Sequence, residues 1–144
     1  MKKPDSLRAA LTAAAPSLKN DPDKLLVFAD EGSVIAVPGA SLSFEYRYTL
    51  HAILLDFAGD ADVIFAAIVE WVWMNQRELI ANRDRHKDGI TFDVDLLGNA
   101  TCDLSIKLKL TERVIARRDD AGQLGAEAKP EPTPSEWEKT GLAG

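Results

Sequence analysis

The side chains in this sequence best suited to chemistry are two histidines, two closely spaced pairs of aspartates and one cysteine. His51 and His86 stand outside the HExxH and HxH spacings that let two imidazoles reach one metal ion. We therefore expect both to make surface or interface contacts. Cys102 falls in the apolar phase of an alternating segment, where a thiol packs as an inert side chain and lacks the surroundings of a nucleophile.

The two aspartate pairs are Asp60 with Asp62 and Asp93 with Asp95, and each brings two carboxylates close together, as magnesium sites do. Both pairs also fit a purely structural role. The first pair begins a helix, where negative charge is favourable, and the second lies on the solvated side of an alternating strand. We therefore expect neither pair to hold a metal ion.

A nuclease-like arrangement of Asp95, Asp103 and Lys107 is incomplete. Restriction-type nucleases place an acid two residues before the lysine, and that position holds Ser105 here. The sequence also lacks a phosphate-binding glycine motif, a nucleophile elbow and a catalytic triad. We expect a protein that is not an enzyme and uses no cofactor.

Composition limits the class of protein further. The 144 residues suit one compact domain, and 46% hydrophobic with 28% charged residues is an ordinary globular balance. The net charge of −6 argues against sequence-specific binding of nucleic acid, which usually needs a basic surface. The longest apolar run, residues 63–74, contains Glu70 and is shorter than the roughly 20 residues that span a bilayer, so no membrane partner is expected.

Periodicity predicts two main helices. Leu7, Ala10, Leu11 and Ala14 share one helical face, in a helix opened by Pro4 with Asp5 or Ser6 as its cap. A second helix is expected over residues 59–82, capped by Asp60. Its first three turns are apolar nearly all round, so it must be covered on more than one side.

The remaining segments predict strands. Residues 25–28 and 34–37 flank Glu31-Gly32-Ser33 and read as a hairpin. Residues 41–57 alternate and then become apolar on both faces, which predicts one long strand that bends or projects from the domain. Residues 90–96 and 102–110 alternate around Gly98-Asn99, where a two-residue hairpin turn requires positive φ.

The chain changes character near Arg118. Residues 118–144 are rich in Gly, Ala, Glu and Pro, with Pro130, Pro132 and Pro134 at alternate positions. This composition favours a flexible or partner-docking arm after a single α/β domain at residues 1–117. Trp137 is the large apolar side chain in that arm, and we expect it either to be exposed or to anchor the arm on a neighbouring subunit.

Four segments carry a family resemblance: KKPDSLRAALTAA, PDKLLVFADEGSVIA, ASLSFEYRYTLHAILLDFAGDADVI and SIKLKLTERVIAR. In this order, from residue 2 to residue 117, they resemble the tail completion protein R (GpR) family of Peduovirus-type contractile-tailed phages. The resemblance implies a virion tail protein, assembled in the host cytoplasm, that works with another completion protein so that a finished tail can join a filled head.

The resemblance, with the periodicity, predicts an α+β fold. We expect a mixed or antiparallel sheet carrying two main helices, a long projecting strand and an extended C-terminal arm. By analogy with tail terminators, the subunit would form a ring, expected to be a hexamer, and would contact tail tube and sheath proteins and the head connector. Interface residues are expected on the long strand within residues 41–57, on the wet face of the strand at residues 103–113, and in the arm. They are Glu45, Tyr46, Arg47, Tyr48, Lys107, Lys109 and Trp137.

Two alternatives stay open at this point. One is a free-standing host binding module or small enzyme, with a ligand site between helix and sheet. The other, within phage biology, is a head–tail connector or a tube-initiating protein. A phage, a defective prophage and a contractile bacteriocin particle are equally compatible with the sequence.

Overall fold

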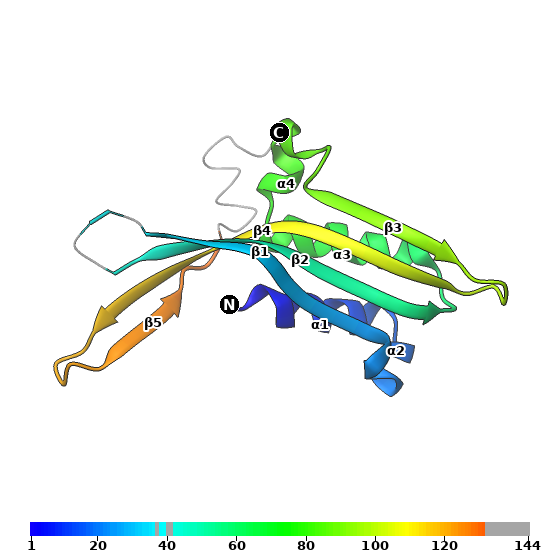
Figure 1. Ribbon diagram of the computed structural model, residues 1–144, viewed down its shortest axis with the longest axis horizontal. Coiled ribbons are helices and arrows are strands. Elements are labelled where there is room, and N and C mark those ends of the chain that lie inside the picture. The colour runs from blue at the N-terminus through cyan, green and yellow to red at the C-terminus, as the bar shows by residue number, and fades with distance from the viewer. Residues whose placement is uncertain (37, 40–41, 132–144) are drawn as a thin grey trace.

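The computed structural model describes residues 1–36, 38–39 and 42–131. They form an α+β fold in which two helices lie against one face of a curled antiparallel sheet (Figure 1). The predicted fold class is confirmed, and every strand pairing among the described residues is antiparallel. Trp137 and the rest of residues 132–144 lie outside the described residues.

The strands β1 (Leu25–Ala36), β2 (Phe44–Phe57), β4 (Cys102–Arg118) and β3 (Ile90–Leu96) follow one another across the sheet. The fifth strand, β5 (Leu124–Ala128), pairs with the far end of β4. Val114 of β4 faces Phe44 of β2 on one side and Ala128 of β5 on the other. β5 therefore lies on the same side of β4 as β3, and a gap separates the two.

The helices cover only the middle of the sheet. α1 (Lys3–Ala14) and α3 (Ala61–Asn75) pack side by side, and the indole N–H of Trp71 donates to Ser6 Oγ at 2.9 Å between them. The short helices α2 (Ser17–Asn20) and α4 (Glu78–Ala81) and the 3₁₀ turns η1 (Pro22–Lys24) and η2 (Arg83–Arg85) make the connections.

One apolar core joins the helices to the sheet. Leu7 and Leu11 are fully buried, as the helical periodicity predicted. The other fully buried large apolar side chains come from β1, α3 and the two central strands. They are Leu25, Leu50, Leu54, Ile64, Ile68, Leu104, Ile106, Leu108 and Leu110. The alternation in β2 and β4 therefore separates a core face, under the helices, from an outer face.

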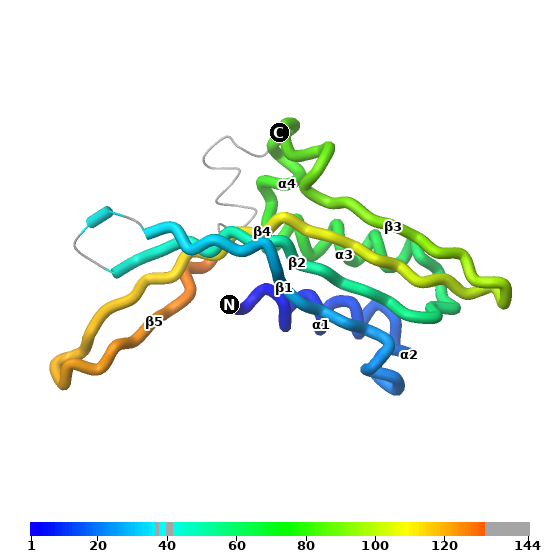
Figure 2. The backbone as a smooth tube through the Cα atoms, in the orientation of Figure 1, coloured from blue at the N-terminus to red at the C-terminus, as the bar shows by residue number. Residues whose placement is uncertain are grey.

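Both central strands extend beyond the helices (Figure 2). β2 has 14 residues and β4 has 17, which at about 3.3 Å per residue is longer than a compact domain of this size. The strand ends project as two ribbons, one of β1 with β2 and one of β4 with β5 (Figure 1), and β2 stays paired with β4 as far as Phe44 and Val114. The expectation of a long projecting strand is confirmed.

Two local predictions about turns were wrong. Glu31-Gly32-Ser33 is not a hairpin turn but an irregularity inside the continuous strand β1, where Glu31 has φ of 50° and pairing with β2 resumes at Ser33. Pairing with the long strand β2 overrides the local turn tendency. The hairpin joining β3 to β4 is present, but its positive φ falls on Ala100 instead of Gly98 or Asn99.

The second helix also ends earlier than residue 82. Asp60 caps it as predicted, accepting from the N–H of Asp62 at 2.9 Å. However, α3 stops at Asn75, and Gln76 turns the chain toward α4. The side chain of Gln76 is buried and bonds to β4, so tertiary contacts end the helix.

Candidate functional site

The residues predicted to form an interface divide between the two faces of the sheet. The outer face carries Glu45, Arg47, Lys107 and Lys109. Along β2 and β4, the cross-strand pairs that contain these residues alternate with pairs whose side chains are buried in the core. Arg47 pairs with Glu45 at 3.2 Å, and Lys109 pairs with Asp88 at 3.3 Å. The outer face therefore presents mixed charge to solvent.

The two tyrosines lie on the core face. Tyr46 is half-buried, and its near neighbour on that face is Phe44, with ring centroids 5.1 Å apart. Tyr48 is buried, and its hydroxyl donates to Glu112 Oε2 at 2.6 Å. The prediction of Tyr48 as a surface contact is corrected, because strand alternation sends it away from the face that carries Arg47.

His51 also lies on the outer face. Its imidazole stacks on Phe28, with centroids 4.5 Å apart, and its Nε2 lies 2.6 Å from Asp30 Oδ1. Within the described ranges, His, Cys, Asp and Glu side chains do not gather in a group of three that could hold a metal ion. The His51 imidazole is thus held against the outer face by Phe28 and Asp30.

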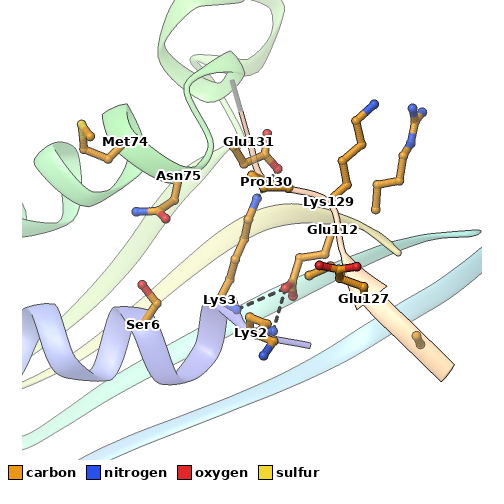
Figure 3. A pocket seen from close by; sticks show the side chains of 13 residues that line it. Lys2, Lys3, Ser6, Met74, Asn75, Glu112, Glu127, Lys129, Pro130 and Glu131 are labelled. Atoms are coloured by element: carbon orange, nitrogen blue, oxygen red, sulfur yellow. Dashed lines mark hydrogen bonds and ion pairs between the residues drawn. The ribbon is translucent and has the colours of Figure 1, made fainter. Parts of the chain in front are cut away.

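A buried polar cluster lies at the gap between β3 and β5, and sequence reasoning missed it. Its members are Lys3, Tyr48, Gln76, Thr111, Glu112 and Glu131. It borders a cleft of about 610 Å³ lined by the start of α1, the end of α3 and the segment after β5 (Figure 3).

Glu112 caps α1 from a distant strand. Its Oε1 accepts from the backbone N–H groups of Lys2 and Lys3, at 2.7 and 3.3 Å. Lys2 is the N-cap, and within α1 itself no side chain caps the helix, so the predicted caps Asp5 and Ser6 are corrected. A carboxylate is well suited here, because free N–H groups and the helix dipole make this terminus positive.

Lys3 and Gln76 close the gap in the sheet. Gln76 Oε1 accepts from the backbone N–H of Thr111 at 3.1 Å, and Lys3 Nζ donates to the Thr111 carbonyl at 2.7 Å. Lys3 Nζ also donates to Gln76. It donates to Glu131 at 2.7 Å as well, and Figure 3 shows the Lys3 side chain extending toward Glu131. Side chains thus replace the missing strand at this point, and they fix the segment after β5 to the domain.

Burial shapes the protonation of two members of this cluster. It lowers the pKa of Lys3 below its usual 10.5, and the Glu131 carboxylate opposes that shift. Burial also raises the pKa of Tyr48 above its usual 10, and the bond to Glu112 raises the pKa further. At a pH somewhat above 10, Tyr48 therefore stays protonated in the folded chain, whereas it would be ionised in the unfolded chain.

Comparison with known proteins agrees with the resemblance carried by the sequence. Residues 1–132 match the model of the P2 phage tail completion protein R (GpR) family. The chain is 43% identical over 136 residues to tail completion protein R of Escherichia phage P2, covering 94% of this chain and 87% of the relative. The chain belongs to the GpR family of phage tail completion proteins.

As a GpR family member, the chain is a structural tail protein, and its place is the virion tail. This membership favours a structural role over the alternative of a host binding module or small enzyme. No solved structure matches the chain. Among the described residues, none of the helices has the length and apolarity needed to cross a bilayer.

We predict that Tyr48 makes this GpR family member sensitive to alkali. Its folded pKa is raised, so the stability it contributes is complete below pH 10 and is lost as the pH rises above 10. The loss should approach about 1.4 kcal/mol per pH unit. The lowered pKa of Lys3 works in the opposite direction, but only up to pH 10.5.

Urea unfolding at pH 9 to 12 of the wild type and of Tyr48→Phe measures this effect. The variant removes the titrating hydroxyl and keeps the ring, so its stability should fall less steeply above pH 10. Parallel curves for the two proteins would contradict the assignment.

Proposed function

We propose that the chain is a ring-forming subunit that ends the growth of a contractile phage tail and prepares the tail for joining to the head. It would act by association alone, with copies of itself, with tube and sheath proteins, with another completion protein and with the head connector. The observation that carries this proposal is the projection of the sheet beyond its helices (Figure 1).

The projecting ribbons support assembly for a physical reason. A two-stranded ribbon is marginally stable alone, because two strands bury little apolar surface. In the part of β4 that pairs with β5, Val114 and Ala116 are buried. In β1 the outer half is largely exposed, and β5 is exposed through most of its length. A neighbouring subunit that covered one ribbon would stabilise it, and the second ribbon would be available to the next component.

The two ribbons also differ from each other. One ends in the β1–β2 connection, and the other ends in the turn between β4 and β5. Contacts between unlike surfaces are heterologous, and they generate a closed ring when the rotation between subunits closes. We infer a ring, expected to be a hexamer, from this asymmetry together with the family membership.

The outer face supplies the charged part of the proposed interface through Glu45, Arg47, Lys107 and Lys109. We predict that Arg47→Glu weakens self-association at least tenfold, because a like-charge contact across an interface costs several kcal/mol. Folding should be little affected, since the exposed ion pair with Glu45 contributes little to stability. Size-exclusion chromatography with light scattering measures the assembly, and electron microscopy of complemented phage measures tail length.

Lys19→Glu is the matched control, since it reverses an exposed charge on α2, away from the outer face. It should leave assembly unchanged. If Arg47→Glu also assembles normally and gives tails of normal length, the outer face is not the interface. A wild-type chain that stays monomeric at every concentration, even with purified tail proteins, would overturn the ring itself.

A further inference from the structure

The two outermost strands of the sheet, β1 and β3, each have one unpaired edge in the described part of the chain. There, β1 pairs with β2 alone and β3 pairs with β4 alone. An unpaired edge presents a row of backbone N–H and C=O groups that can bond to another strand. Proline and lysine, which often protect such edges, occur in neither β1 nor β3. Residues 25–30, ahead of the irregularity in β1, and residues 90–96 are therefore suited to strand addition.

Both edge strands also carry large apolar side chains that solvent reaches. Leu26 and Phe28 of β1 are each 44% exposed. β3 was expected to be half-buried, but Phe92 is 57% exposed and Leu96 is 86% exposed. Pairing with a further strand would bury part of this apolar surface, and its burial would stabilise the pair.

The directions of β1 and β3 suit a row of identical subunits. Three antiparallel pairings lead across the sheet from β1 to β3, so these two strands run in opposite directions. In a ring whose axis follows the strands, every subunit keeps the same strand direction. β3 of one subunit would therefore meet β1 of the next as an antiparallel pair, which is the pairing that the rest of the sheet uses.

The same arrangement would extend the helix layer over β3. α1 contacts β1 and lies beside α3, so the helices cover the β1 side of the sheet (Figure 2). On the other side of α3, the exposed residues Val69 and Trp73 follow Phe65 at intervals of four, and the ring of Phe65 contacts Phe92 of β3. In joined sheets, α1 of the next subunit would lie next to this side of α3.

Charges at the two edges are complementary at one level of the sheet. The cross-strand pairs place Leu25 of β1 level with Val94 of β3. Lys24 precedes Leu25 and Asp95 follows Val94, so these two charges are also level, at opposite edges. Asp95 is exposed and has no ion-pair partner among the described residues, and Lys24 has one contact, 3.7 Å long, with Asp56. Subunits of a closed ring stand at the same height, so Lys24 of one would face Asp95 of the other.

We propose that β3 of one subunit pairs antiparallel with residues 25–30 of β1 in the next copy of the chain, with Lys24 facing Asp95. One continuous sheet then runs around the ring, with all helices on the same side of it. This inference rests on the proposed ring and specifies which edges join its subunits.

Crosslinking of single-cysteine variants tests this pairing in the full chain, with Cys102→Ala as the background. Leu26→Cys and Asp93→Cys, which lie on one level at opposite edges, are produced together, one of them carrying an affinity tag. A short bismaleimide then links cysteines that lie across a junction. We expect mixed dimers at least fivefold more abundant than dimers of either variant with itself. Asp120→Cys replaces Asp93→Cys in the control and should give no mixed dimers, since Asp120 is an exposed acid in the turn after β4.

A charge exchange tests the level at which the edges meet. Lys24→Glu should weaken self-association at least tenfold, because it places a like charge against Asp95. Asp95→Lys in the same chain should restore association to within threefold of wild type, and Asp120→Lys, the matched control, should restore nothing. Light scattering over a concentration series measures the association. Unchanged association of Lys24→Glu, or equal effects of the two second changes, would overturn the pairing.

Light scattering of the crosslinking samples separates this inference from the ring, and circular dichroism verifies that each variant is folded. An assembled ring without mixed dimers would overturn the strand pairing and leave the ring standing. Self-dimers of Leu26→Cys or Asp93→Cys in excess of mixed dimers would show that like edges meet, and they would overturn it too. A chain that is monomeric at every concentration would overturn both.

Discussion

Replacing Glu112 with alanine is expected to lower the free energy of unfolding by about 3–5 kcal/mol, because several donors lose a charged acceptor and each unsatisfied buried donor costs about 1–3 kcal/mol. The carboxylate accepts from Lys2 and Lys3 at the start of α1 and from the hydroxyl of Tyr48. Glu112→Ala leaves all three donors without their acceptor, two of them buried and the Lys2 N–H part-buried, and each buried donor carries a desolvation cost. Urea unfolding followed by circular dichroism measures the loss.

Glu127→Ala is the matched control, since Glu127 lines the same cleft from β5 but is exposed. Its effect should stay below about 0.5 kcal/mol, as for most surface substitutions. A double-mutant cycle of Glu112→Ala with Tyr48→Phe should show coupling, because one bond joins the two side chains. If Glu112→Ala and Glu127→Ala cost the same, the capping role of Glu112 is wrong.

The sequence was sufficient to predict those helices and strands whose periodic apolar residues form their buried face. The helical spacing of Leu7 and Leu11 predicted α1, and the alternation around Tyr48 and Leu50 predicted β2. Asp60 predicted the start of α3. In each case the local pattern and the tertiary environment favour the same structure, because burial of the apolar face is what stabilises the element.

Elements defined by a distant partner could not be predicted. Glu31-Gly32-Ser33 has the composition of a turn, and only pairing with β2 keeps β1 continuous through it. Similarly, Leu124–Ala128 contains few strand-forming residues, and its position along β4 makes it β5. The division of the chain at residue 117 stays a prediction, although a paired strand follows it.

One member of the polar cluster, Glu112, could be recognised as unusual from the sequence. Glu112 stands in the apolar phase of β4, two residues after Leu110 and two before Val114. A charge in that phase predicts a buried carboxylate that needs donors. Its donors, at Lys2, Lys3 and Tyr48, lie far away along the chain, so the pattern could flag Glu112 but could not name its partners.

Between β3 and β5, this edge of β4 has no neighbouring strand among the described residues. The side chain of Gln76 makes hydrogen bonds to β4 there, in place of the backbone of a strand. Gln76→Leu keeps a similar volume but removes the acceptor for the Thr111 N–H and for Lys3, and the donor to Thr111 Oγ1 at 3.0 Å. We expect a loss of about 3 kcal/mol, since each unsatisfied buried group costs about 1–3 kcal/mol. Thermal and urea unfolding measure the loss.

Asn75→Leu is the control for this substitution, because among the described residues the neighbouring amide donates to the Trp71 carbonyl in its own helix alone, and it is half-buried. It should cost less than about 1 kcal/mol, the typical net contribution of a single hydrogen bond. Hydrogen exchange adds a local readout: the Thr111 amide should lose protection in Gln76→Leu and keep it in Asn75→Leu. If the Thr111 amide stays protected in both variants, Gln76 does not close the sheet, and bound water or the segment around Glu131 must do so.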